Sequence, residues 1–322
     1  MVRKISTSAV LKDASIESDD VVIDDGVKLT NVYIKAKKVV IKANAELTEC
    51  KLFSDGKITI GKATVIKERT IINAFLGISI GDRTVIDRDV FVGGMQSEKS
   101  ELIVGDDCVV LYRSYLNTTR KITIGSNTGI GGYSKIFTHS SWPNVLKGNP
   151  FKFADVVMQD NVWIAWDVLI MPGVVIERDT IVGSGSVVTK SLPAFVVAAG
   201  APAKVIREKK QEPSVQEKNR IMLEIFNDFH NYAAGFLKQS NTLDIDPPTC
   251  IMKFDNVTLM YSDNLSDLKM NRDGIAISLQ VPAKIKRSNQ WIELDSLTAE
   301  IKSDPAKHFV AFARRYGIRI KT

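Results

Sequence analysis

The chain has 322 residues with a formal net charge of +6, and 44% of its residues are hydrophobic and 25% charged. This length suits two domains of ordinary size, and the basic residues are spread out rather than clustered with aromatic ones as in nucleic-acid-binding proteins. The N-terminus lacks the apolar core of a signal peptide, no stretch is as long as a membrane span, and three scattered cysteines make no disulfide framework. We therefore expect a cytoplasmic protein without a transmembrane segment or a nucleic-acid partner.

Aliphatic residues recur at every sixth position through most of the first two hundred residues. Small or β-branched residues at 168, 174, 180 and 186 accompany the clearest series, which is Ile164, Ile170, Ile176, Val182 and Val188. Earlier triplets have the same step: Ile41, Leu47, Phe53; Ile60, Ile66, Ile72; Ile80, Ile86, Val92; Val104, Val110, Leu116; and Ile124, Ile130, Ile136. A helix would repeat near 3.6 residues and a half-exposed strand at 2, so this pattern predicts stacked triangular coils of three short strands. Glycine after the aliphatic residue, as in IGKATV and IGDRTV, suits a tight bend between strands.

One long interval interrupts the six-residue step. After position 136 the next predicted inward residue is Met158, so residues 137–157 are expected to leave the coil as an extended loop. Long loops on a rigid scaffold commonly carry function. This loop contains His139, whereas His230 and His308 lie beyond the repeat in helical patterns that favour structural roles. His139 is therefore the candidate general base.

Residues 162–207 resemble the hexapeptide-repeat acyltransferases in the segment VWIAWDVLIMPGVVIERDTIVGSGSVVTKSLPAFVVAAGAPAKVIR. The likeness is to the bacterial maltose and galactoside O-acetyltransferases and to the O-acetyltransferases of capsule and O-antigen synthesis, over roughly residues 20–210. It implies a mainly β fold in which residues 1–211 form a left-handed parallel β-helix with an extended catalytic loop at 137–157. Residues 212–322 have no counterpart there, and we expect a small C-terminal α+β domain of unknown role.

The resemblance also implies site residues. His139 matches the histidine that deprotonates the acceptor hydroxyl, and the backbone N–H of Trp166 matches the oxyanion donor. Coenzyme A is expected to bind along the coils, with the cationic side chains nearest its phosphates, at Ala165, Trp166, Ser184, Thr189, Lys190, Lys204 and Arg207.

Two positions depart from the family pattern. Trp166 stands where sugar acetyltransferases have a small polar residue, and Leu111 stands where galactoside acetyltransferases have an acceptor-binding Asn. The acceptor pocket is therefore expected to differ. The group that orients His139 is left open, with Arg113 as one candidate.

The implied function is that of an acetyl-CoA-dependent O-acetyltransferase acting on a bacterial sugar or polysaccharide of the capsule or O-antigen type. Transfer is expected to be direct, without an acyl-enzyme or a metal, in a homotrimer whose cofactor lies between neighbouring β-helices. Alternatives are N-acyl transfer to an amino sugar, O-acetylation of an antibiotic and a non-catalytic scaffold. A zinc-dependent carbonic anhydrase on the same fold would need three histidine ligands, and the repeat has one. The sequence does not determine the acceptor, the position acetylated or the acyl group.

The last third of the chain has mixed patterns. A helical spacing follows the charged linker EKKQEPSVQEKN, at Ile221, Ile225, Phe229, Ala233 and Phe236. The segments CIMKFDNVTLMYSD and GIAISLQVPAKIK are predicted as strands, and Ser303-Asp304-Pro305 is typical of the start of a helix.

Overall fold

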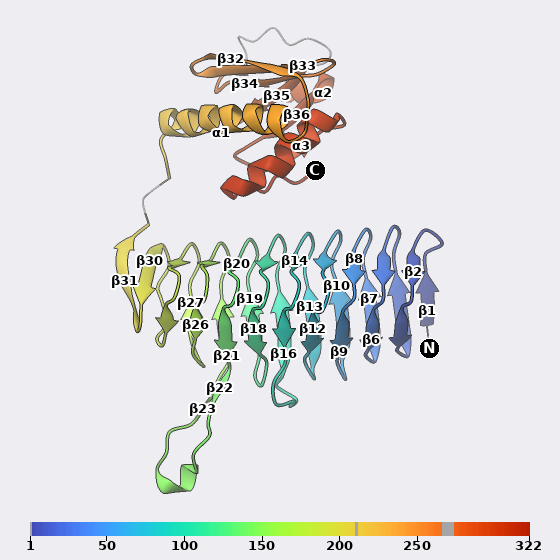
Figure 1. The fold of residues 1–322 in the computed structure, drawn as a ribbon, viewed down its shortest axis with the longest axis vertical. Coiled ribbons are helices and arrows are strands. Elements are labelled where there is room, and N and C mark those ends of the chain that lie inside the picture. The colour runs from blue at the N-terminus through green and yellow to red at the C-terminus, as the bar shows by residue number, and fades with distance from the viewer. Residues whose placement is uncertain (1, 210–211, 266–273) are drawn as a thin grey trace. The chain divides into compact units, whose positions relative to one another are not determined.

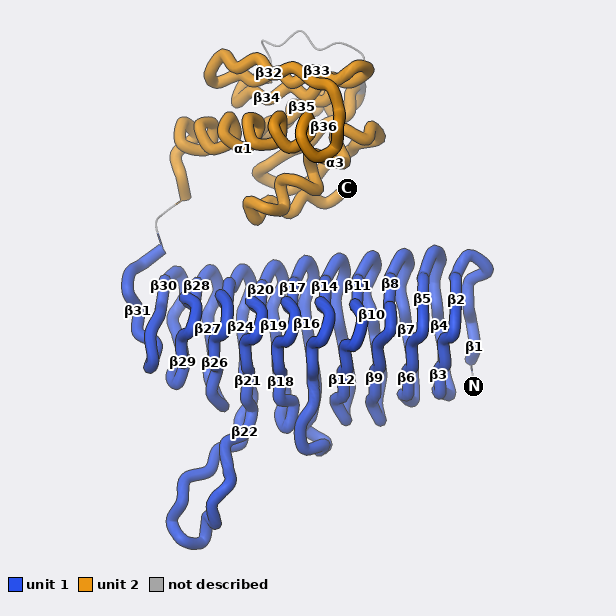
Figure 2. Tube along the Cα trace, in the orientation of Figure 1, with its two compact units in different colours: residues 1–209 blue, residues 210–322 orange. Residues whose placement is uncertain are grey.

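A computed structural model describes residues 2–209, 212–265 and 274–322 and divides the chain into two compact units, residues 1–209 and 210–322 (Figure 1, Figure 2). The predicted domain boundary, between 211 and 212, involves a residue outside the described ranges. None of the described helices is long and apolar enough to cross a membrane.

The coils of the first unit form three sheets whose strands alternate along the chain. Sheet A contains β1 (Val2–Ile5), β4 (Asp20–Ile23), β7 (Lys38–Ile41), β10 (Lys57–Ile60), β13 (Gly77–Ile80), β16 (Glu101–Val104), β19 (Ile122–Ile124), β24 (Val156–Met158) and β27 (Val175–Ile176). Sheet B contains β2 (Val10–Lys12), β5 (Lys28–Thr30), β8 (Glu46–Thr48), β11 (Val65–Ile66), β14 (Val85–Ile86), β17 (Val109–Val110), β20 (Gly129–Ile130), β25 (Trp163–Ile164), β28 (Ile181–Val182), β30 (Val196–Gly200) and β31 (Ala203–Glu208). Sheet C contains β3 (Ser15–Glu17), β6 (Tyr33–Lys35), β9 (Lys51–Phe53), β12 (Ile71–Asn73), β15 (Phe91–Val92), β18 (Tyr115–Asn117), β21 (Lys135–Phe137), β26 (Leu169–Ile170) and β29 (Val187–Val188).

The chain passes from sheet A to B to C and then begins the next coil. Neighbouring strands are parallel, apart from the antiparallel pair of β30 and β31 at the end of sheet B. The coils form a left-handed parallel β-helix, which confirms the predicted fold class. The first coil, β1–β3, precedes the region of family likeness and pairs with the second coil through β1 and β4.

Burial confirms the six-residue step along most of the β-helix. Inward residues such as Ile60, Ile66 and Ile72 are completely buried. Met158 is also completely buried and lies in register with Ile124, so the predicted inward position after the long loop is correct.

The prediction that the side chain of Phe53 points into the core is wrong. Its neighbour Leu52 is the buried residue, and Phe53 is half-buried against the ring of Tyr33, with 5.5 Å between ring centroids. The corner before this strand is one residue shorter than elsewhere, so the next inward residue after Leu47 is Leu52, five positions later rather than six.

The glycines that follow the inward aliphatic residues have a different role from the expected one. Gly61, Gly81 and Gly105 are not among the residues with positive φ, so the bend itself does not require glycine. A Cβ on Gly61 would lie 2.2 Å from the carbonyl carbon of Gly81 in the next coil. Glycine is needed there because stacked corners approach one another closely.

Replacing Gly61 by Ala is therefore expected to lower the free energy of unfolding by about 1–3 kcal/mol, the usual cost of overpacking. Gly77→Ala is the matched control, since its added Cβ would meet its nearest neighbour, the carbonyl oxygen of Lys57, at 3.3 Å. Equilibrium denaturation followed by circular dichroism measures both variants. Equal losses of stability would contradict the close-approach explanation.

The described residues of the second unit form a six-stranded sheet and three α-helices. The sheet order is β32 (Asn241–Asp246), β33 (Thr249–Phe254), β34 (Thr258–Tyr261), β35 (Gly274–Ser278), β36 (Gln290–Glu293) and β37 (Thr298–Glu300). The helices are α1 (Val215–Gly235), α2 (Ala283–Ser288) and α3 (Asp304–Ala313). The core of this unit includes the rings of Phe226 and Phe229 from α1 and Phe309 from α3.

Two predictions for this unit are wrong in detail. The segment GIAISLQVPAKIK is a strand only in its first part, β35, which ends at Ser278, and its last residues form α2 after Pro282. Phe236 lies just after α1 and is 73% exposed, whereas Phe226, which the spacing did not predict, is completely buried.

Candidate functional site

Two insertions leave the β-helix at the same corner, where sheet C passes to sheet A. Residues 93–100 connect β15 to β16, and residues 138–155 connect β21 to β24. The second insertion contains a hairpin that projects from the coils in Figure 1, made of β22 (His139–Ser140), the 3₁₀ turn Val145–Lys147 and β23 (Lys152–Phe153). The corner of the intervening coil, after β18, lies between the two insertions.

His139 lies at the base of the hairpin, beside two side chains of that intervening corner. Its Nδ1 atom is 2.9 Å from Asn117 Oδ1 and 3.2 Å from Thr119 Oγ1. Asn117 and Thr119 are buried, and the imidazole is half-buried. Two buried polar groups that converge on one ring nitrogen restrict the orientation of the ring.

The hydrogen bonds of Asn117 decide which nitrogen of neutral His139 carries the proton. Asn117 Nδ2 donates to the Tyr115 hydroxyl at 2.9 Å, and Asn117 Oδ1 accepts from the Thr119 N–H at 3.3 Å, so the amide orientation is fixed. An amide oxygen can only accept, and Nδ1 must therefore be the donor. Nε2 then presents a lone pair, as a general base requires.

A cavity of about 470 Å³ lies beside the imidazole. Its lining from sheet C and the hairpin is mainly apolar and includes Phe137, Leu169, Met171 and Trp142. The ring of Phe153 stacks on His139 with 5.7 Å between centroids, and the guanidinium of Arg120 lies 5.6 Å from the Phe153 centroid. An apolar cavity with a few polar reactive groups is typical of small-molecule sites.

The predicted cofactor residues lie along the edges of the later coils. Successive turns between sheets B and C hold Ala165, Trp166 and Ser184. Thr189 and Lys190 follow β29 in sheet C, just as His139 follows β21 in the same sheet two coils earlier. Lys204 and Arg207 lie on β31. Ala165 is half-buried, and the other six side chains are exposed. Among the described residues that line the cavity beside His139, none of these seven is present.

Trp166 belongs to an aromatic column at the corner between sheets B and C. Its ring centroid lies 5.4 Å from that of Tyr112 and 6.4 Å from that of Tyr133. Arg113 is part of the same column, since its guanidinium donates to the Tyr133 hydroxyl at 3.2 Å. The suggestion that Arg113 orients His139 is therefore wrong, and Asn117 has that position.

Sequence reasoning missed Asn117, Thr119 and the first insertion. A signal for the insertion was present, because Val92 and Val104 are twelve positions apart whereas the equivalent residues Ile72 and Ile80 are eight apart. No comparable signal marked Asn117, since its contact with His139 depends on the side-by-side stacking of two coils.

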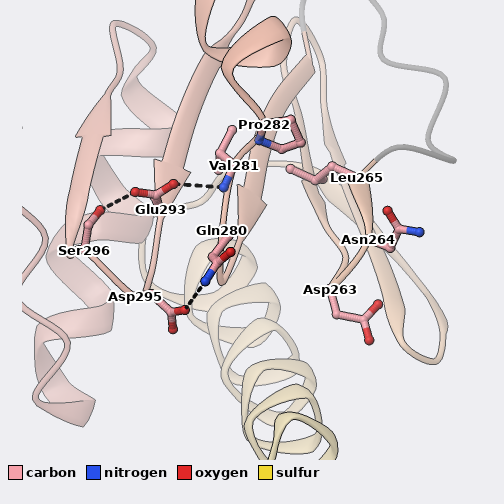
Figure 3. A pocket seen from close by; sticks show the side chains of 9 residues that line it. All are labelled: Asp263, Asn264, Leu265, Gln280, Val281, Pro282, Glu293, Asp295 and Ser296. Atoms are coloured by element: carbon pink, nitrogen blue, oxygen red, sulfur yellow. Dashed lines mark hydrogen bonds between the residues drawn. The ribbon is translucent and has the colours of Figure 1, made fainter.

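A second cavity, of about 650 Å³, lies in the second unit beyond the ends of β34, β35 and β36 (Figure 3). Its carboxylates are already bonded, because Glu293 pairs with Lys286 at 2.8 Å and Asp295 accepts from Gln280 at 3.3 Å. Burial raises the pKa of Glu293, but hydrogen bonds, first that from Lys286, outweigh burial and lower this pKa to about 2. Across the described residues, no group of three or more His, Cys, Asp or Glu side chains is placed to hold a metal ion. We assign no catalytic role to this cavity.

Comparison with known proteins relates the chain to acetyltransferases. No family model matches it. A putative colanic acid biosynthesis acetyltransferase of Escherichia coli (strain K12), WcaF, is 35% identical over 145 residues, a match that covers 44% of this chain and 75% of the relative. The galactoside O-acetyltransferase of the same strain is 38% identical over 89 residues, 27% of this chain and 44% of the relative. A solved hexapeptide-repeat acetyltransferase of Vibrio cholerae is 24% identical, with a TM-score of 0.34, over 39% of this chain and 72% of that chain.

Proposed function

Since this chain belongs to the hexapeptide-repeat acetyltransferases and is an acyltransferase, as predicted, we propose that it acetylates a hydroxyl group of a bacterial sugar or polysaccharide. The acyl donor is acetyl-CoA. The observation that carries the proposal is the bond from His139 Nδ1 to Asn117 Oδ1, which leaves Nε2 as a base beside an open cavity. The names of the colanic acid and galactoside relatives support a glycan acceptor of the capsule or O-antigen type.

In the proposed reaction, Nε2 of His139 takes the proton of the acceptor hydroxyl while the hydroxyl oxygen attacks the thioester carbonyl carbon. The carbon–sulfur bond then breaks, the acetyl ester forms, and the imidazolium returns the proton to the coenzyme A thiolate. Asn117 Oδ1 accepts from Nδ1–H throughout and stabilises the imidazolium charge. A positioned base of this kind typically contributes about 10²–10⁴-fold to the rate.

The oxyanion of the tetrahedral intermediate needs a hydrogen-bond donor. We place the backbone N–H of Trp166 in this role, because the turn after β25 leaves it without an acceptor among the described residues. Ala165 and Ser184 are proposed to line the path of the pantetheine arm, and Thr189 to lie near the nucleotide end. The exposed cations Lys190, Lys204 and Arg207 suit the phosphates of the nucleotide end.

The residues proposed for one reaction lie on different corners of the β-helix. His139 is at the corner between sheets C and A, and Trp166 and Ser184 are at the corner between sheets B and C. We therefore propose that the complete site forms between neighbouring copies in a homotrimer, with acetyl-CoA in the groove between them.

Sedimentation combined with a thiol-release assay tests this function. Incubated with acetyl-CoA and a panel of bacterial capsule and O-antigen polysaccharides, the fraction that sediments as a trimer is expected to release coenzyme A with at least one glycan. A fully active monomer would contradict the shared site. Failure to release thiol with free sugars and with every glycan would contradict the function itself.

A further inference from the structure

The first insertion, residues 93–100, has no part in the reaction as described. It is nevertheless hydrogen-bonded to the corner after β18, whose side chains Asn117 and Thr119 contact His139. The Gly93 carbonyl oxygen accepts from the Thr118 N–H at 3.2 Å. The Met95 N–H donates to Thr119 Oγ1 at 3.1 Å, and Ser97 Oγ donates to the Thr119 carbonyl oxygen at 3.2 Å. One short loop thus makes three bonds to two adjacent residues.

Gly94 lies close against this corner and leaves no room for a side chain. A Cβ on Gly94 would lie 2.7 Å from Thr119 Oγ1 and 3.0 Å from Asn117 Oδ1, the two atoms that face His139 Nδ1. Gly94 is not among the glycines with positive φ, so proximity rather than backbone conformation excludes a side chain there.

The corner itself is unusual in burying three consecutive polar residues, Asn117, Thr118 and Thr119. Burial of polar groups is costly unless each is hydrogen-bonded. Thr118 Oγ1 donates to the Asn73 carbonyl oxygen at 3.0 Å, and the other two side chains converge on the imidazole. The network is therefore complete only when the loop on one side and His139 on the other are both in place.

We propose that residues 93–100 are a positioning element that keeps the proton of His139 on Nδ1 and so keeps Nε2 free. The Met95 N–H fills one acceptor site of Thr119 Oγ1, and Gly94 lets Thr119 and Asn117 reach Nδ1 together. Gly94 and Thr119 are positioning residues, because Thr119 contacts the base and Gly94 lies against Thr119 and Asn117, and neither touches the reacting atoms. The proposal rests on the role of His139 in the proposed function.

The test is Gly94→Ala in the full chain with ¹⁵N-labelled histidine. The signals of His139 are assigned by their loss in His139→Gln, and their ¹⁵N shifts report which ring nitrogen carries the proton. We expect the population with the proton on Nδ1 to fall, kcat to drop about 10²-fold and KM for acetyl-CoA to stay unchanged, as for a displaced base. Gly77→Ala, in an ordinary strand of the same β-helix, is the control and should match the parent protein in all three.

If Gly94→Ala does not fold, Thr119→Val and Thr119→Ser provide a second test through the same measurements of the tautomer and of kcat. Valine keeps the shape but removes one of the two oxygens that face Nδ1 and the acceptor of the Met95 N–H, while Asn117 stays in place. The population with the proton on Nδ1 and kcat are therefore both expected to fall, by less than in Gly94→Ala, whereas serine keeps the hydroxyl and should match the parent protein in both. An unchanged tautomer in the folded Gly94→Ala or Thr119→Val protein would overturn the proposal, as would a changed tautomer with unchanged kcat. Activity retained in His139→Gln would instead refute the proposed base, which the NMR measurement does not require.

Discussion

Replacing His139 by Ala is expected to lower the rate of acetyl transfer by about 10²-fold or more, because the acceptor hydroxyl loses its base. The fold should persist, since β22 belongs to a hairpin outside the stacked coils and His139 contributes nothing to the buried core of the β-helix. KM for acetyl-CoA should change little, because the proposed contacts to the nucleotide end come from other residues. Thiol release gives the rate, and circular dichroism verifies the fold.

His230→Ala is the matched control for that experiment. His230 Nδ1 also donates one short side-chain bond, at 2.5 Å to Asn241 Oδ1, but His230 lies on α1 in the second unit. Its loss should leave kcat close to that of the parent. If His139→Ala retained activity within about threefold of the parent, an effect far below that of a positioned base, the assignment of His139 would be wrong.

Replacing Asn117 by Leu is expected to lower kcat by about 10²-fold although Asn117 does not touch the reacting atoms. Leucine has a similar volume but cannot accept from Nδ1–H, so the imidazole loses the partner that fixes its tautomer and orientation. The Tyr115 hydroxyl and the Thr119 N–H lose a bonded neighbour as well, which should also lower the stability of this corner.

Asn117→Asp separates the tautomer from simple loss of packing. A carboxylate oxygen at the same place still accepts from Nδ1–H, so this variant should retain much more activity than Asn117→Leu. Single-turnover rates at saturating acetyl-CoA compare the two. Equal rates in the leucine and aspartate variants would show that Asn117 acts only through packing.

The fold could be predicted from the sequence because every coil needs the same kinds of residue at the same positions. An inward aliphatic residue at every sixth position, with a small residue at each corner, leaves few other ways to bury the chain. The errors fall where the repeat is shortened, as at Phe53, or where a corner is lengthened, as at residues 93–100. The packing of α1 could be predicted only in part, because helical spacing indicates a buried face without showing where the helix ends.

Only the part of the candidate site that local sequence features mark could be predicted. His139 could be identified because it lies in the long loop and is the only histidine of the repeat region. Its partners Asn117 and Thr119 are 22 and 20 positions away in sequence and come near it only because the coils stack. The glycine at position 94 likewise has no local explanation, since its neighbours are two side chains of the following coil. Such contacts depend on register between coils, which no single six-residue unit specifies.

Transfer of labelled acetyl groups is the most direct test of the central claim. The parent protein and His139→Ala are incubated with deuterium-labelled acetyl-CoA and bacterial polysaccharide, and the glycan is analysed by mass spectrometry before and after treatment with hydroxylamine, which cleaves esters and leaves amides. We predict that the parent attaches the label, that hydroxylamine removes it, and that His139→Ala attaches almost none. Label that resists hydroxylamine, or equal labelling by His139→Ala, would contradict O-acetyl transfer with His139 as its base.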